Sequence, residues 1–174
     1  MKKIFSMIAL AAMFSFVACD PETDEEPGGT NIEKMAGVWD VQYDGVDDDG
    51  NITMEDPFGA GICTLYTYNT NDNGTAQMWL DDRNTFWAYK FLTNINYGAR
   101  TFANEAVDYD AAGSGTAIVE DGKILEGAAK NEHGMPTDSI SFYITFSDDQ
   151  YVGRYWTKLH VSGRRHSGFS ADTE

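Results

Sequence analysis

The sequence predicts an all-β fold: an antiparallel meander of eight or nine strands closed into a barrel. From residue 37 onward, short segments alternate apolar and polar side chains, and no 11-residue window keeps a helical period. Brief turns rich in Asp, Asn and Gly separate the segments, as at residues 47–51 and 96–98. An open sheet would leave two exposed edges, so closure is the economical arrangement, with an open sandwich as the alternative.

The first strand is expected at residues 36–43, where Trp39, Val41 and Tyr43 alternate and therefore share one face. Gly37 lies two residues before the Trp, at a position where a side chain would block a close approach. This strand opens the first region of the chain that reads as folded.

Later strands are expected wherever alternation runs between two turn signals. The clearest is residues 139–146, whose even-numbered positions are all Ile or Phe. Asp121-Gly122 is a hairpin signal and is expected to join two separate strands. The full expected set after the first strand is residues 62–68, 75–81, 86–95, 100–103, 116–120, 123–129, 139–146 and 151–164.

The N-terminal region predicts export and anchoring. Lys2 and Lys3 precede an uncharged apolar run that ends at Ala18-Cys19 and is short for a membrane span. Small residues before that Cys resemble the bacterial lipobox, which implies that Cys19 is acylated and becomes the mature N-terminus. Ordinary cleavage beside an incidental Cys is the alternative. The expected domains are a lipoprotein signal peptide (1–18), a lipidated acidic tether (19–34) and a barrel (35–174).

Charge and composition exclude several classes of function. Twelve basic residues against 28 acidic ones give a net charge of −16, which repels phosphate backbones, so nucleic acid is not an expected partner. The same charge repels anionic membrane surfaces, so any membrane attachment must come from something other than charge. No spacing of Cys and His suits a metal site, and no cofactor is expected. Cys63 reads as a small core residue.

The residues give little support for catalysis and more for binding. The chain has three His but no Gly-x-Ser-x-Gly elbow, so no catalytic residue is assigned. Large aromatic residues recur on the expected strands, which favours an apolar pocket, although a packed core explains each one singly. The expected ligand-binding residues are Trp79, Trp87, Tyr89, Phe91, Phe142 and Trp156.

The Gly37-x-Trp39 opening resembles that of the lipocalins and other calycins. In that family the Trp closes one barrel end, and a basic residue of the last strand packs across it. The resemblance implies that Arg164 or Arg165 lies over the Trp39 ring.

A wider resemblance covers residues 35–172. Five segments together resemble a family of secreted lipoproteins labelled "lipid-binding putative hydrolase": MEDPFG (54–59), MWLDD (78–82), NTFW (84–87), GMPTDSI (134–140) and SGRRHSGF (162–169). This resemblance implies a calycin-like fold, lipid binding and hydrolysis, without assigning catalytic residues.

The expected function is a membrane-anchored lipoprotein that holds a lipid or other small apolar ligand in its barrel. The alternatives are a hydrolase acting on a lipid or ester, and a surface-assembly protein with a filled barrel. The expected location is the outer membrane of a Gram-negative bacterium, on its periplasmic or cell-surface face.

Overall fold

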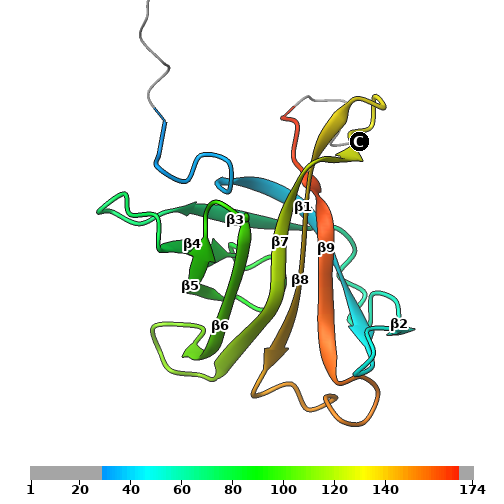
Figure 1. Cartoon of the computed structure of the whole chain (residues 1–174). Coiled ribbons are helices and arrows are strands. Elements are labelled where there is room, and N and C mark those ends of the chain that lie inside the picture. Colours follow the sequence, from blue (N-terminus) through cyan, green and yellow to red (C-terminus); the bar gives the residue numbers. More distant parts are fainter. Residues whose placement is uncertain (1–28, 169–174) are drawn as a thin grey trace, which may run out of the picture.

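A computed structural model describes residues 29–168, and every regular element in this range is a β-strand (Figure 1). The residues predicted to form the signal peptide, and Cys19, lie outside the described residues. No helix among the residues described is long and apolar enough to cross a membrane. The strands are β1 (Gly37–Val46), β2 (Ile52–Met54), β3 (Cys63–Asn69), β4 (Gln77–Asp81), β5 (Lys90–Asn96), β6 (Thr101–Asp108), β7 (Thr116–Lys130), β8 (Pro136–Phe146) and β9 (Lys158–Arg165).

The strands form one sheet that closes on itself. Its order is β2-β1-β3-β4-β5-β6-β7-β8-β9, and β1 also pairs with β9. Every pairing between these strands is antiparallel, so β1 and β3–β9 make a closed eight-stranded barrel and β2 is an extra strand on β1. The predicted all-β, closed antiparallel meander is therefore confirmed.

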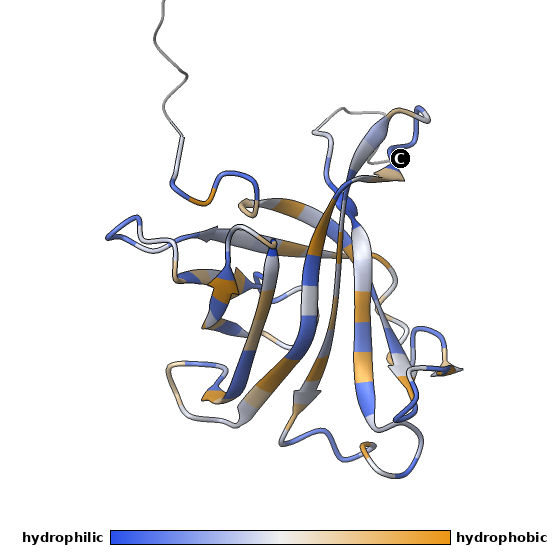
Figure 2. Ribbon diagram, viewed as in Figure 1, coloured by the Kyte–Doolittle hydropathy of each residue, from blue (hydrophilic) through white to orange (hydrophobic). Residues whose placement is uncertain are grey.

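Apolar and polar side chains alternate along the strands, and the apolar ones fill the barrel interior. In Figure 2, hydrophobic and hydrophilic bands follow one another along β7 and β9. On β8 the four residues Ile140, Phe142, Ile144 and Phe146 are all at most 2% exposed, as their shared face predicts. Inward residues of all eight barrel strands join them in one hydrophobic core.

One barrel end is closed around Trp39, which is 0% exposed. Its indole Nε1 donates to Thr67 Oγ1 at 2.8 Å. Arg165, its register partner on β9, holds its guanidinium carbon 4.4 Å from the centre of the indole ring. A Cβ on Gly37 would collide with that guanidinium, so the glycine leaves room for an arginine side chain and not for another backbone. Arg164 points to the outer face, where it pairs with Glu132.

The core begins before the first strand. Ile32 and Met35 lie in a turn that precedes β1, and both are 0% exposed. The Met35 carbonyl accepts a hydrogen bond from Thr67 Oγ1 at 2.6 Å. Ile32 falls in the segment expected as a tether, so the described end of that segment packs against the barrel.

The structure corrects three strand predictions. Asp121-Gly122 does not form a hairpin: β7 runs through it, and the register with β8 slips there as a β-bulge. The strand expected at 86–95 begins only at Lys90, since Ala88 has a φ of 62° that breaks the extended chain. The strand expected at 151–164 begins at Lys158, after a series of turns.

Substituting Gly163 should weaken barrel closure. A Cβ there would strike the Asp40 carbonyl and would lie only 2.7 Å from the Val41 Cα, both on β1. We expect Gly163→Ala to lower the free energy of unfolding by about 1–3 kcal/mol in urea denaturation, as overpacking does. At Gly98 the nearest atom is 3.7 Å away, so Gly98→Ala is the matched control. Equal stabilities of the two variants would contradict this account of closure.

Candidate functional site

The barrel end opposite Trp39 is filled by aromatic side chains from its loops. We call Phe58, Phe86, Trp87 and Trp156 the aromatic plug. Phe58 lies edge-on to the other three, with ring centres 5.3–5.6 Å apart. Below the plug, Phe86 stacks on Tyr43 at 3.7 Å and Trp87 stacks on Phe146 at 4.7 Å. These contacts close this end of the barrel with apolar surface.

Aspartates hold the loops that carry the plug. Asp82 is 0% exposed, and its carboxylate accepts from the backbone N–H groups of Trp87 at 2.7 Å and Ala88 at 2.8 Å. Asp149 accepts from the indole Nε1 of Trp156 at 2.9 Å. Charge-assisted bonds of this kind fix loops that have no strand ladder.

A tyrosine pair lies deeper in the barrel. The hydroxyls of Tyr43 and Tyr89 share a hydrogen bond of 2.8 Å, and both residues are 1% exposed. Burial raises the pKa of both hydroxyls well above the usual tyrosine value, and the shared bond and the charge of Asp82 modify this effect. Both residues therefore remain neutral in the folded barrel.

The wall of the barrel is weakest between β5 and β6. Their register covers only residues 94–96 and 101–103, whereas β1 and β9 pair at eight positions. One further backbone hydrogen bond joins the start of β5 to the residue after β6: the Lys90 N–H donates to the Tyr109 carbonyl at 2.7 Å. On its other side, β6 meets β7 with two register shifts. Irregular ladders on both sides leave β6 loosely joined to the sheet.

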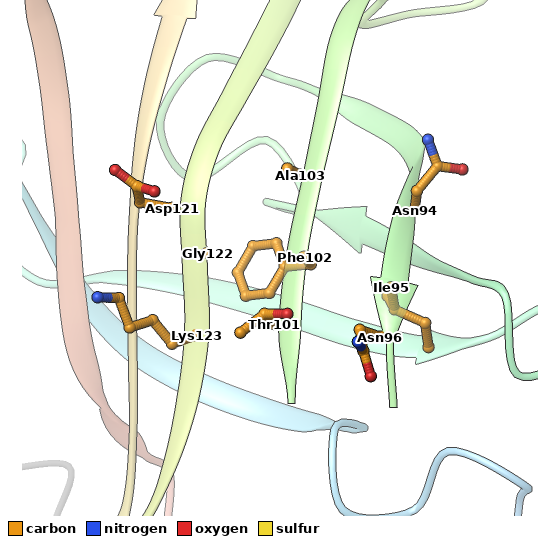
Figure 3. Close-up of a pocket in the computed structure, with 9 residues that line it drawn as sticks. All are labelled: Asn94, Ile95, Asn96, Thr101, Phe102, Ala103, Asp121, Gly122 and Lys123. Atoms are coloured by element: carbon orange, nitrogen blue, oxygen red, sulfur yellow. The ribbon is translucent and has the colours of Figure 1, made fainter. Parts of the chain in front are cut away.

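Two hollows flank this strand on the outer face and share Asn94 and Ala103, so we treat them as one β6 groove. The first, of about 580 Å³, is lined by Asn94, Ile95, Asn96, Thr101, Phe102, Ala103, Asp121, Gly122 and Lys123 (Figure 3). The second, of about 480 Å³, is lined by Asn94, Ala103, Asn104, Glu105, Ala106, Ile118 and Glu120. These volumes fall in the range of small-molecule sites.

Phe102 forms the apolar floor of the groove. Figure 3 shows its ring between β6 and β7, beside the backbone of Gly122. A Cβ on Gly122 would collide with the ring, so the glycine of the bulge allows Phe102 to lie flat against β7. Phe102 also contacts Phe142 with ring centres 5.4 Å apart, which connects the groove floor to the barrel core.

Two buried oxygens on β5 and β6, Thr93 Oγ1 and Asn104 Oδ1, have no hydrogen-bond partner among residues 29–168. Thr93 is 0% exposed and lines neither hollow, whereas Asn104 lines the second one. The Asn104 amide nitrogen donates to the carbonyls of Glu105 at 2.7 Å and Ala117 at 3.3 Å, which leaves its oxygen unpaired. Such an unpaired buried group costs about 1–3 kcal/mol.

The aromatic residues predicted to bind a ligand occupy three different places. Tyr89, Phe91 and Phe142 lie inside the barrel and are at most 2% exposed. Trp87 and Trp156 belong to the aromatic plug. Trp79 lies on the outer face, because Met78 and Leu80 take the two inward positions of β4, and it stacks on Tyr68 at 6.4 Å. The structure brings the first five into one connected core and leaves Trp79 apart.

The chain also resembles a known protein family over most of its length. The profile described as "Lipid-binding putative hydrolase" matches residues 24–170. The chain belongs to this family. The predicted resemblance is therefore confirmed, and a closed barrel of this kind fits lipid binding. No curated protein matches the chain.

The family's hydrolase label directs attention to polar groups on the outer face of β1, β8 and β9. Ser141 Oγ and His160 Nε2 lie 2.9 Å apart. Burial lowers the pKa of His160, while the charge of Asp44, its register partner on β1, opposes that effect. His160 is therefore neutral near pH 7 and able to accept a proton. His166 contacts Asp40 at 3.1 Å from either carboxylate oxygen.

The same outer face has a hollow of about 890 Å³, which Asp40 and His166 line. Its lining includes Asp40, Asp44, Glu132 and Arg164, so it suits a polar group better than an acyl chain. Within residues 29–168, no three His, Cys, Asp or Glu side chains come together as a metal site.

Sequence reasoning did not find the residues that shape the β6 groove in this family member. Asp121-Gly122 is recognisable in the sequence, where it predicts a hairpin turn, but in the structure it forms a β-bulge within β7. Thr93 lies on the same face as Phe91 and Ile95, which marks it as an inward polar residue. No signal in the sequence identifies Asn104, because its inward position depends on the bulges of β6 and β7.

Alkaline pH should destabilise the barrel through the tyrosine pair. Tyr43 and Tyr89 have raised pKa values, so their stabilisation is complete below about pH 10 and is lost as the pH rises above it. The free energy of unfolding should fall by about 1.4 kcal/mol per pH unit for each of them. Urea denaturation across this range should show a shallower fall for Tyr43→Phe/Tyr89→Phe. An unchanged slope would contradict the assignment.

Proposed function

We propose that this protein is a membrane-anchored lipoprotein that binds a lipid or other small apolar ligand along the β6 groove. The observation that carries the proposal is the groove itself, an elongated hollow where the β5–β6 ladder is shortest. Its floor is the Phe102 ring, and Ile95, Ala106 and Ile118 add apolar surface. Concave apolar surface with a few polar groups is what a lipid site requires.

The interior aromatic residues support the groove in this proposal and do not contact the ligand directly. Tyr89, Phe91 and Phe142 pack within the core, and both barrel ends are covered by side chains. A ligand that approaches the core therefore does so from the side, past Phe102. This differs from a ligand that enters through an open barrel end.

The lipid site can be tested without disturbing the core. Ala103 is exposed and lines both hollows, so Ala103→Gln should fill the groove without altering the barrel. We expect a fluorescent monoacylglycerol to bind the parent saturably and this variant about tenfold more weakly, a loss of ~1.4 kcal/mol.

Ala128→Gln is the matched control, since Ala128 is an exposed alanine of β7 outside both linings. It should bind the probe as the parent does. Equal binding by the parent and both variants would contradict the groove assignment. Absence of binding to the parent would favour the assembly role.

The anchor is tested separately. Cys19 follows an apolar run and small residues, and an acidic segment comes after it. Acyl chains gain about 0.8 kcal/mol per buried methylene, so two or more of them hold a protein stably to a membrane. Cys19→Ala should move the protein from the outer-membrane fraction to the soluble one. A variant that fractionates like the parent would refute the lipoprotein proposal.

Ester hydrolysis is the second candidate, and the Ser141–His160 contact favours it. In this chemistry, Ser141 Oγ attacks the ester carbonyl while His160 takes the hydroxyl proton and passes it to the leaving alcohol. Water then hydrolyses the acyl-serine. The contact lies beside the polar hollow, because Ser162 and Asp44, which line it, are the register partners of these two residues.

A panel of chromogenic esters decides between binding alone and hydrolysis. We expect no turnover by the parent protein, since no pair of donors aimed at an oxyanion accompanies Ser141 among the contacts of the described residues. Turnover lost in Ser141→Ala and retained in Ser139→Ala, a serine on the same face of β8, would establish the hydrolase instead.

A further inference from the structure

The polar hollow of about 890 Å³ lies on the opposite side of the barrel from the β6 groove. It follows the outer face of β1, which is four strands from β6 in either direction around the barrel. Asp40, Gln42 and Asp44 line it, because Val41 and Tyr43 take the inward positions of this strand. From the first aspartate to the second, the extended chain covers about 13 Å.

Asp44 holds a carboxylate at one end of this hollow without a basic partner. The residue is only 6% exposed. Gln42 Nε2 and the Asp56 N–H donate to its Oδ1 at 2.8 and 3.0 Å, and no described residue donates to Oδ2. His160, its register partner on β9, bonds to Ser141 instead. A carboxylate removed from water in this way gains from a cation that reaches its second oxygen.

The other acidic residues of the lining already have basic partners. Glu132 pairs with Arg164, and Asp40 contacts His166 at 3.1 Å. None of the ion pairs among the described residues includes Asp44. The lining therefore offers one position for a positive group of a ligand, at the Asp44 end.

Hydroxyl groups border β1 on both sides of the hollow. Thr64 on β3 is the register partner of Asp40, and Ser162 on β9 is the register partner of Gln42. A hydroxyl both donates and accepts, so these side chains are complementary to the hydroxyls of a ligand. Since no three acidic, His or Cys side chains of the described residues converge as metal ligands, a cation here is held by charge and hydrogen bonds.

We propose that this hollow binds a hydroxyl-bearing organic amine, whose ammonium group pairs with Asp44 Oδ2 and whose hydroxyls bond to Thr64 and Ser162. The net charge of −16 favours the approach of a cationic ligand and disfavours an anionic one. The inference goes beyond the lipid site and does not depend on it, because the two sites lie on opposite sides of the barrel.

Three probes that differ at one carbon test the role of charge. Glucamine, sorbitol and gluconate share a six-carbon hydroxylated chain and end in an ammonium, a hydroxyl and a carboxylate. Their binding to the intact protein is compared by calorimetry near pH 7, where the amine is protonated. The parent should bind glucamine about tenfold more tightly than sorbitol, and gluconate most weakly. Equal affinities for the three probes, or no binding of glucamine, would overturn the inference.

Asp44→Asn tests the carboxylate itself, because it keeps the shape and the acceptor oxygen and removes the charge. This variant should bind glucamine no more tightly than sorbitol. Asp48→Asn is the matched control, since Asp48 is exposed and lies outside the lining, and it should retain the preference.

A second variant keeps the test decisive if Asp44→Asn does not fold. Ile62 is 66% exposed and lines the hollow, so Ile62→Lys adds a competing ammonium group without altering the core. It should weaken glucamine binding about tenfold and sorbitol binding much less. A glucamine preference that survives in both variants would show that Asp44 does not hold the amine.

Discussion

The ladder between β1 and β9 is the constraint on which the rest of the structure depends. Its eight register pairs join the first strand to the last and remove the edges of the sheet. Gly163 allows the two backbones to approach, and the Arg165 guanidinium covers Trp39 at the end of the seam. Because side chains also cover the other end of the barrel, neither end leaves the core open.

The acidic character of the chain is partly structural. Asp82 and Asp149 bind backbone and indole N–H groups of the loops that carry the aromatic plug, and both are at most 7% exposed. Asp148 adds bonds from the Trp87 indole and the Tyr109 hydroxyl. Three of the 28 acidic residues therefore also hold the apolar end of the barrel in place.

The barrel was predictable because alternation and turn chemistry are local properties. Ile140 and Phe142 face inward, as their spacing predicts, and Trp39 lies opposite an arginine. The hairpin predicted at Asp121-Gly122 was wrong because a hairpin turn and a β-bulge both accommodate a positive φ. Here φ is 51° at Asp121. The neighbours of Trp79 are apolar on both sides, so its outward direction depends on tertiary packing. The groove could not be predicted because it arises where β5 and β6 pair over only three residues and β6 shifts register against β7.

The short register between β5 and β6 also has a mechanical consequence. Among the eight seams of the barrel formed by the described residues, it has the fewest register pairs, three, against nine between β7 and β8. Separating these two strands breaks the fewest backbone bonds and leaves β1 and β9 joined. Under heat or tension the barrel therefore separates first between β5 and β6, so that the most easily opened seam of the wall coincides with the β6 groove.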